Sequence, residues 1–220
     1  AVAIRMTGKW YRDQTRMQTL EKEKSEAELS QLKSQLNPHF LFNSLNNIYA
    51  LVQFDQQKAQ KAISSLSDML RYQLYDAEKE RIPLQKELEF VRSYCGLMQL
   101  RTPKTCRVNL RIDEPIQELF IAPLMFITLV ENAFKHGMSP TEPSFVDIQI
   151  RVQEDHSILC SVRNSAFPKD QSDRSGSGIG LDNLKKRLNL IYPGQYNFFT
   201  ENKDGVYTAQ IILFNTEQHA

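Results

Sequence analysis

His39 is the first residue of the sequence whose type and setting could support chemistry. It falls in a helical pattern in which His39, Asn43 and Asn46 lie within about 60° of one another, because each helical residue turns by about 100°. The apolar residues of this pattern fall on the opposite side, so we expect His39 to face solvent. A neutral imidazole with a pKa of about 6.5 is largely unprotonated near neutral pH and can act as a nucleophile. A single histidine is more often a bystander, and that alternative stays open.

A second candidate lies on the helix predicted over residues 123–136. Its polar residues Thr128, Glu131, Asn132 and Lys135 share an arc of about 100°, while almost all its other residues are apolar. A buried helix must satisfy such a polar edge somewhere. Carboxylate and carboxamide oxygens can bind Mg²⁺ and an ammonium group can neutralise phosphate, so the edge suits a Mg²⁺–phosphate site. The alternative is a plain ion pair between Glu131 and Lys135, which stand four residues apart.

A glycine-rich segment is the third candidate. Gly176, Gly178 and Gly180 precede Leu181 and a basic helix. Closely spaced glycines let backbone N–H groups approach an anion, and a helix N-terminus favours negative charge. The segment is not a Walker A loop, and Leu181 stands where the dinucleotide-binding pattern has its last small residue. By itself such a loop is more often only a flexible turn.

The elements that must hold His39 are helical. The pattern over residues 10–36 predicts one polar helix with a narrow apolar seam, which suits a coiled coil; a helix lying on the rest of the domain is the alternative. Asn37 and Pro38 then suit the N-cap and the first position of a new helix. A second amphipathic helix follows over residues 57–77. Such a hairpin buries its apolar stripes poorly, so a dimeric four-helix bundle is the natural completion.

The sequence pattern changes at Arg81, where strands begin to alternate with helices. Period-two alternation predicts the strands, and a polar Ser/Gly/Asp-rich loop spans residues 165–177. The expected elements are helices over 83–100, 123–136 and 181–191, strands over 108–112, 146–152 and 158–162, and a final hairpin centred on Asp204 and Gly205. Strands interleaved with helices mostly on one face make an α+β sandwich.

Composition excludes several classes of protein. The 220 residues carry 27 basic and 26 acidic side chains, and a net charge of +1 argues against direct nucleic-acid binding. Three cysteines without C-x-x-C spacing exclude a disulfide framework and a cysteine-based zinc site, and favour a reducing compartment. No run reaches the roughly 20 apolar residues that span a bilayer. Because the chain opens without an initiator Met, we expect a fragment whose only link to a membrane is a missing upstream segment. A trimmed soluble domain is the alternative.

The three candidates together resemble the motifs of one family. LNPHFLFNSLN, from Leu36 to Asn46, resembles the H-box of LytS/YehU-type sensor histidine kinases. ENAFKHG, from Glu131 to Gly137, resembles the N-box of the GHKL ATPase superfamily, and residues 176–181 resemble its G2-box. The segment NLKKRL that follows is typical of this kinase subgroup. The motifs occur in the family's order and cover the chain from about Leu36 to the C-terminus.

The resemblance implies three parts. These are a signalling helix or coiled-coil linker over residues 1–36, a dimerisation and histidine-phosphotransfer hairpin over 37–80, and a GHKL-type catalytic domain over 81–220. The last part would be a Bergerat-type ATP-binding sandwich. The chain would be the cytoplasmic portion of a bacterial plasma-membrane sensor and would act as a homodimer. Its partner would be the receiver domain of a response regulator, whose aspartate accepts the phosphoryl group.

The resemblance also implies roles for single residues. His39 would attack the γ-phosphate of ATP, and Asn132 would coordinate Mg²⁺ between the phosphates. Glu131 would position groups around the metal or polarise a water molecule. The other residues that would contact phosphate or form the lid over it are Lys135, His136, Gly176, Gly178, Gly180 and Leu181.

Two positions depart from the family pattern. The Asp-x-Gly-x-Gly box, whose aspartate reads the adenine amino group, corresponds here to residues 162–166 with Asn164 in the aspartate's place; its carbonyl can still accept from an adenine N–H. Many histidine kinases carry an acidic general base directly after the phosphoacceptor, but Phe40 stands there, so the base is unassigned. Asn43 resembles the position that orients water in bifunctional kinases, and we expect it to support dephosphorylation of the regulator.

Two other functions stay open beside an ATP-dependent protein-histidine kinase. The adenine box, which has Asn164 in place of a charged aspartate, also suits a pseudokinase, a dimeric nucleotide-binding scaffold that signals without phosphorylating His39. A plain GHKL ATPase or serine-kinase-like switch, in which His39 is incidental, is disfavoured by the long H-box.

Overall fold

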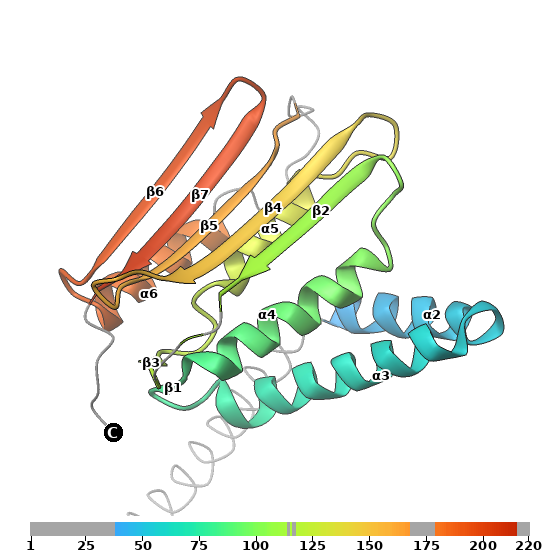
Figure 1. Ribbon diagram of the computed structural model, residues 1–220, viewed down its shortest axis with the longest axis horizontal. Helices are drawn as coiled ribbons and strands as arrows, with labels where there is room; N and C mark the ends of the chain where they lie inside the picture. Colours follow the sequence, from blue (N-terminus) through green and yellow to red (C-terminus); the bar gives the residue numbers. More distant parts are fainter. Residues whose placement is uncertain (1–37, 114, 116–117, 168–178, 215–220) are drawn as a thin grey trace, which may run out of the picture. The chain divides into compact units, whose positions relative to one another are not determined.

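The computed structural model describes residues 38–113, 115, 118–167 and 179–214, so the helix predicted over 10–36 lies outside them. The chain divides into two compact units, residues 1–45 and 46–220. The second unit contains the sheet and most of the helices (Figure 1). The α+β class predicted from the sequence is confirmed. None of the helices in the described ranges is both long and apolar enough to cross a membrane.

The helical part begins with α2 (Pro38–Phe54), which starts where the Asn-Pro pair predicts a new helix. Asp55 caps the next helix, α3 (Gln56–Arg71), because its side chain accepts the backbone N–H of Lys58 at 3.0 Å. α3 passes directly into a π-helical turn, η1 (Tyr72–Asp76). Such turns are rare and often occur at functional sites.

The main sheet has five strands in the order β2-β4-β5-β7-β6. Its strands are β2 (Cys106–Ile112), β4 (Ser144–Val152), β5 (Ile158–Ser165), β6 (Tyr196–Lys203) and β7 (Val206–Leu213). β2 pairs with β4 in parallel, and the other neighbours are antiparallel. Asp204 and Gly205 have φ values of 52° and 75°, as the tight turn between β6 and β7 requires, so the predicted final hairpin is confirmed.

Three helices pack with the sheet. They are α4 (Leu84–Gln99), α5 (Ile127–His136) and α6 (Ile179–Ile191). α5 and α6 lie behind the sheet in Figure 1, and α4 runs alongside α3. Every second residue of β4 is buried with the apolar sides of these helices, which explains the period-two pattern of the sequence. A separate two-stranded ribbon joins β1 (Ile82–Pro83) to β3 (Phe120–Ile121).

The predicted start of α5 is wrong by four residues. The sequence suggested Pro123 as the first helical position, whereas α5 begins at Ile127. Leu124 has a φ of 56°, in the left-handed region, so the chain cannot be α-helical there. The backbone N–H groups of residues 124–126 donate to the side chain of Glu87.

Candidate functional site

α5 carries the polar edge that the sequence predicts. Glu131 and Lys135 are exposed, and Asn132 and His136 are half-buried. The rest of the helix is fixed in the core through Ile127, Leu129, Val130, Ala133 and Phe134. One side of α5 is therefore anchored by packing, and the other presents a carboxylate, a carboxamide, an ammonium group and an imidazole.

At the C-terminal end of α5, Gly137 meets Asn164 of β5. A Cβ atom on Gly137 would lie 2.5 Å from the Cβ of Asn164 and 2.6 Å from the carbonyl oxygen of Ala133, so a larger residue would displace its neighbours. Asn164 is 3% exposed, and its Nδ2 donates to the carbonyl oxygen of Ser165 at 2.8 Å. Because this bond uses the amide nitrogen, the carbonyl oxygen is the atom that could accept from an adenine amino group.

At the other end of α5, the first turn of α6 approaches Thr128. A Cβ atom on Gly180 would stand 3.6 Å from Cγ2 of Thr128, an ordinary van der Waals distance. The first turn of α6 therefore lies beside Thr128 of the polar edge, and a helix N-terminus favours anions. Leu181, in the same turn, is half-buried. Gly176 and Gly178 lie outside the described residues.

These two contacts bracket the polar edge along the helix. Asn132 stands four residues after Thr128 and five before Gly137, which is about 6 Å and about 8 Å along the axis at 1.5 Å per residue. The structure thus places Asn164 and the start of α6 against the two ends of α5, the helix that carries Asn132. Their roles remain predictions.

Glu131 combines exposure with a perturbed carboxyl group. The residue is exposed, yet desolvation by the surrounding protein raises its pKa. It lies near buried Tyr94 of α4, whose pKa is raised first by burial and then by the Glu131 charge. Tyr94 in turn packs edge-to-face on Phe134, with ring centroids 6.1 Å apart. The predicted role of Glu131 near the metal or a water molecule stays a prediction.

The donor set of this edge fits a Mg²⁺ ion that is bound mainly through phosphates. Asn132 offers a carboxamide oxygen and Glu131 a carboxylate, and Mg²⁺ typically takes one or two protein oxygens together with phosphates and water. Among the described residues, no three His, Cys, Asp or Glu side chains are grouped so that they could hold a metal ion by themselves. Asn132 is the residue that would hold the ion.

His39 and Asn43 belong to a different part of the chain. His39 is the second residue of α2, and Asn43 follows about one turn later and is half-buried. Both fall in the unit of residues 1–45, whereas the α5 edge falls in the unit of residues 46–220. Their predicted roles stay predictions.

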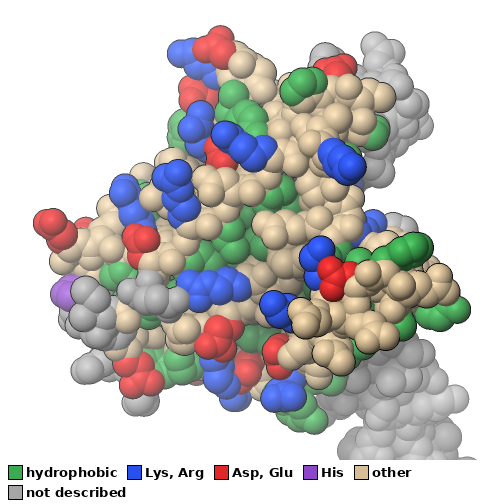
Figure 2. Space-filling model, turned by 45° about the vertical axis from the view of Figure 1, so that its right-hand side comes forward, with side chains coloured by type: hydrophobic (Ala, Val, Ile, Leu, Met, Phe, Trp, Pro, Cys, Tyr) green, Lys and Arg blue, Asp and Glu red, His purple; other side chains and the backbone are tan. Residues whose placement is uncertain are grey.

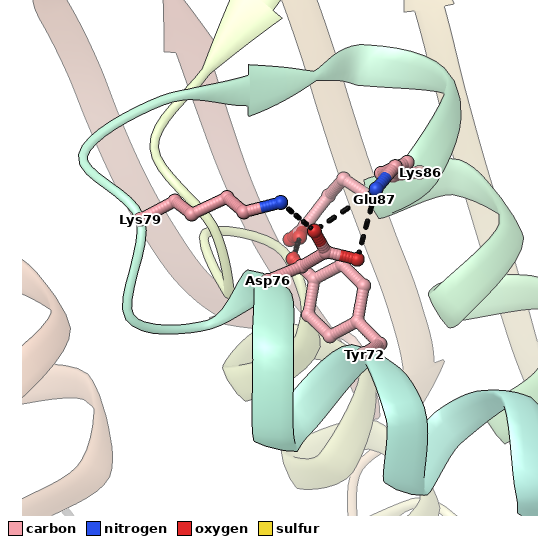
Figure 3. A network of polar contacts seen from close by, with 5 residues as sticks. All are labelled: Tyr72, Asp76, Lys79, Lys86 and Glu87. Atoms are coloured by element: carbon pink, nitrogen blue, oxygen red, sulfur yellow. Dashed lines mark hydrogen bonds and ion pairs between the residues drawn. The ribbon is translucent and has the colours of Figure 1, made fainter.

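Glu87, a fully buried carboxylate on α4, was not among the residues predicted from the sequence. Its oxygens accept the backbone N–H groups of residues 124–126 at 2.9, 2.8 and 3.2 Å, and also accept the hydroxyl of Tyr72 (Figure 3). Burial raises the pKa of Glu87, and these hydrogen bonds act in the opposite direction. A signal was present, because Glu87 lies on the apolar stripe of Leu84, Leu88 and Val91, where an acidic side chain needs internal partners.

Comparison with known proteins identifies the class. A family model described as histidine kinase matches residues 27–106. The sensor protein LytS of Staphylococcus epidermidis is 35% identical over 178 residues, which cover 76% of this chain and 30% of that protein. The sensor histidine kinase/phosphatase LytS of Staphylococcus aureus is 31% identical over 180 residues, covering 76% of this chain and 31% of that protein. The class is therefore that of the histidine kinases.

Within that class, the chain belongs to the family of LytS-type sensor histidine kinases. It spans about a third of the length of these relatives. Among solved structures, it is similar to the histidine kinase domain of the Erythrobacter litoralis EL346 blue-light activated histidine kinase. That likeness has 15% identity and a TM-score of 0.46, and it covers 84% of this chain and 92% of that chain.

Proposed function

We propose that this chain is an ATP-dependent protein-histidine kinase that phosphorylates His39 and passes the phosphoryl group to the aspartate of a response regulator. The observation that carries the proposal is the polar edge of α5, bracketed by Asn164 at one end and by Gly180 at the other. Membership of the sensor histidine kinase family supports it, and His39 lies inside the range that the family model matches.

In this proposal the nucleotide lies along α5. The adenine amino group donates to the carbonyl of Asn164, while Lys135 and His136 contact the phosphates and the Lys135 ammonium group offsets part of their charge. The N–H groups at the start of α6, from Gly180, receive phosphate oxygens. When bound, Mg²⁺ neutralises phosphate charge, and Asn132 would hold it.

The proposed reaction is a phosphoryl transfer from ATP to histidine. The unprotonated imidazole nitrogen of His39 attacks the γ-phosphorus while the bond from that phosphorus to the β–γ bridging oxygen breaks. The products are ADP and a phosphorylated imidazolium, which loses its other ring proton to water. A carboxylate oxygen of the regulator then attacks the phosphorus, the N–P bond breaks, and the imidazole of His39 takes up a proton from water as it leaves.

We also propose that the active form is a homodimer joined through the helical hairpin. Tyr49 and Val52 on α2 and Ile63 on α3 are 75%, 47% and 54% exposed, which is unusual for large apolar side chains. Hydrophobic side chains open to solvent are visible among the charged ones in Figure 2. Pairing of two hairpins would cover such a face.

The nucleotide part of the proposal is tested by calorimetric titration of the chain with ATP and Mg²⁺. Asn132→Ala and Asn164→Ala should each weaken binding about tenfold or more, because each removes a polar contact to the nucleotide. Asn109→Ala on β2, which replaces the same residue type away from α5, is the matched control and should bind as the wild type does. Equal affinity in all four proteins would refute the proposed site.

The role of Asn43 is tested with the phosphorylated regulator. Asn43→Ala should leave phosphorylation of His39 in place and slow dephosphorylation of the regulator. Unchanged dephosphorylation would show that Asn43 has no part in it.

A further inference from the structure

The backbone segment that precedes α5, residues 124–126, is held in place by a side chain from another helix. α5 has no side-chain cap at Phe126, the residue that precedes it. Glu87 of α4 instead binds the backbone that leads into the helix, because its two oxygens accept the N–H groups of residues 124–126. Phe126, the last of these, is the N-cap residue of α5, and the N–H of Leu124 also donates to the hydroxyl of Tyr72. The start of the helix that carries Asn132 is therefore fixed by Glu87.

The same carboxylate also binds the end of the hairpin. The hydroxyl of Tyr72, in η1, donates to Glu87, and it also accepts the backbone N–H of Leu124 at 3.2 Å. In Figure 3 the Tyr72 hydroxyl points at Glu87. Tyr72 thus contacts both Glu87 and the backbone of Leu124, just before α5.

A second contact fixes η1 to the first turn of α4. Asp76, in η1, is bound by Lys86 at 2.9 Å and by Lys79 at 2.6 Å. Lys86 directly precedes Glu87 in the chain, so the π-helical turn is attached to α4 at two adjacent residues (Figure 3). A shift of η1 would therefore also displace Glu87, which lies in the interior.

We propose that Glu87 is a positioning residue for the nucleotide site, and that Tyr72 couples this site to the end of α3. The inference rests on the proposed function, because it takes the α5 edge to be the nucleotide site. Glu87 sets where α5 begins and hence where Asn132 stands. Because Tyr72 binds Glu87 and Leu124, a movement of η1 changes the position of the residues just before α5.

Two nearly isosteric substitutions separate the two parts of the proposal. Glu87→Gln keeps the shape but leaves only one accepting oxygen for four donors. Tyr72→Phe removes only the hydroxyl, because the ring still stacks on Phe90 with centroids 4.3 Å apart. Tyr75→Phe is the matched control, since Tyr75 lies in the same π-helical turn but is exposed.

The measurements are the Kd for ATP with Mg²⁺ and the rate of His39 phosphorylation at saturating ATP, made on the 220-residue chain. Glu87→Gln should raise the Kd about tenfold, because it disturbs the start of α5. Tyr72→Phe should leave the Kd within about twofold but lower the saturated rate about fivefold. It should do so because it disturbs the alignment of the bound ATP with His39 rather than the binding of ATP. Tyr75→Phe should change neither value. A purely structural role would lower the free energy of unfolding without this split.

Each result decides the inference. A folded Glu87→Gln protein with wild-type Kd would overturn the positioning role, and a Tyr72→Phe protein with wild-type rate would overturn the coupling. If Glu87→Gln does not fold, the Tyr72→Phe result decides. If the wild type binds ATP but never labels His39, the proposed function fails, while the Kd of Glu87→Gln still tests whether Glu87 positions the site.

Discussion

The sheet layer and the helical hairpin bury their apolar side chains to very different degrees. In the sheet layer, Phe126, Ile150 and Ile158 are 0–1% exposed, whereas Tyr49 and Phe54 on α2 are more than two-thirds exposed. All five residues belong to the unit of residues 46–220, so the contrast lies within one compact unit. The sheet and its helices bury most of their large apolar side chains, whereas the hairpin leaves more of them exposed, on a face that is proposed to be covered by a second copy. Stability and assembly should therefore respond to different residues.

The largest effect is expected from the closed core. Phe134→Ala removes a fully buried ring from α5 and should lower the free energy of unfolding by about 3–5 kcal/mol, measured by urea denaturation. Phe199→Ala on β6 makes the same change at a side chain that is 46% exposed, and should cost less than about 1 kcal/mol. Equal losses would contradict the view that the sheet layer owes its stability to this core.

The next effect should appear in assembly rather than in folding. Ile63→Glu places a charge on the exposed apolar face of α3 and should raise the Kd of the dimer about 30-fold, measured by analytical ultracentrifugation. Gln57→Glu adds the same charge at an exposed polar position of α3 and is the control. If both variants dimerise as the wild type does, the exposed face is not the dimer interface.

A smaller effect compares two glycines. Gly137→Ala would force a Cβ against Asn164 and should destabilise the protein by about 1–3 kcal/mol, with weaker ATP binding. Gly96→Ala, inside α4, meets nothing within 4 Å and should stabilise it by about 0.5–1 kcal/mol. Urea denaturation and ATP titration measure both. If Gly137→Ala changed neither the free energy of unfolding nor the affinity for ATP, the close contact between Gly137 and Asn164 would not be required for either.

The smallest effect depends on pH. Desolvation raises the pKa of Asp76, but the hydrogen bonds from Lys79 and Lys86 outweigh it and hold that pKa below its usual value. A carboxyl whose pKa is lower in the folded state stabilises that state above its unfolded pKa of about 4, and this contribution is lost as the pH falls through the folded pKa. Asp76→Asn should therefore cost up to about 1 kcal/mol near neutral pH, because both lysines are about half exposed.

Urea denaturation over a range of pH checks this expectation. The difference between wild type and Asp76→Asn should be largest near neutral pH and should shrink in acid. A difference that stays constant across the range would mean that the ionised carboxylate contributes nothing.

Local patterns predicted most elements of the sheet layer. Alternation of apolar residues located β2, β4 and β5, and the Asp204–Gly205 pair located the last hairpin, because these signals lie within a few neighbouring residues. The start of α5 was mispredicted because Leu124 is left-handed and the backbone before the helix is bound by Glu87, 37 residues before Leu124 in the chain. No local pattern contains such a partner.

The candidate site was predicted in part for the same reason. The polar edge of α5 follows from helical periodicity, since Glu131, Asn132 and Lys135 share one arc. The contact between Gly137 and Asn164 comes from packing between a helix and a strand, so its close approach could not be predicted from spacing alone. The π-helical turn that carries Tyr72 was also not predicted, because the apolar pattern of α3 continues through it as in an ordinary helix.

Phosphorylation of His39 is tested by incubating the chain with γ-labelled ATP and Mg²⁺, beside His39→Gln and Asn132→Asp. A histidine kinase that acts through His39 should carry label that is acid-labile and alkali-stable on the wild type and absent from both variants. Label that persists in His39→Gln, or a wild type that binds ATP and takes up no label, would contradict the claim that this chain is a histidine kinase acting through His39.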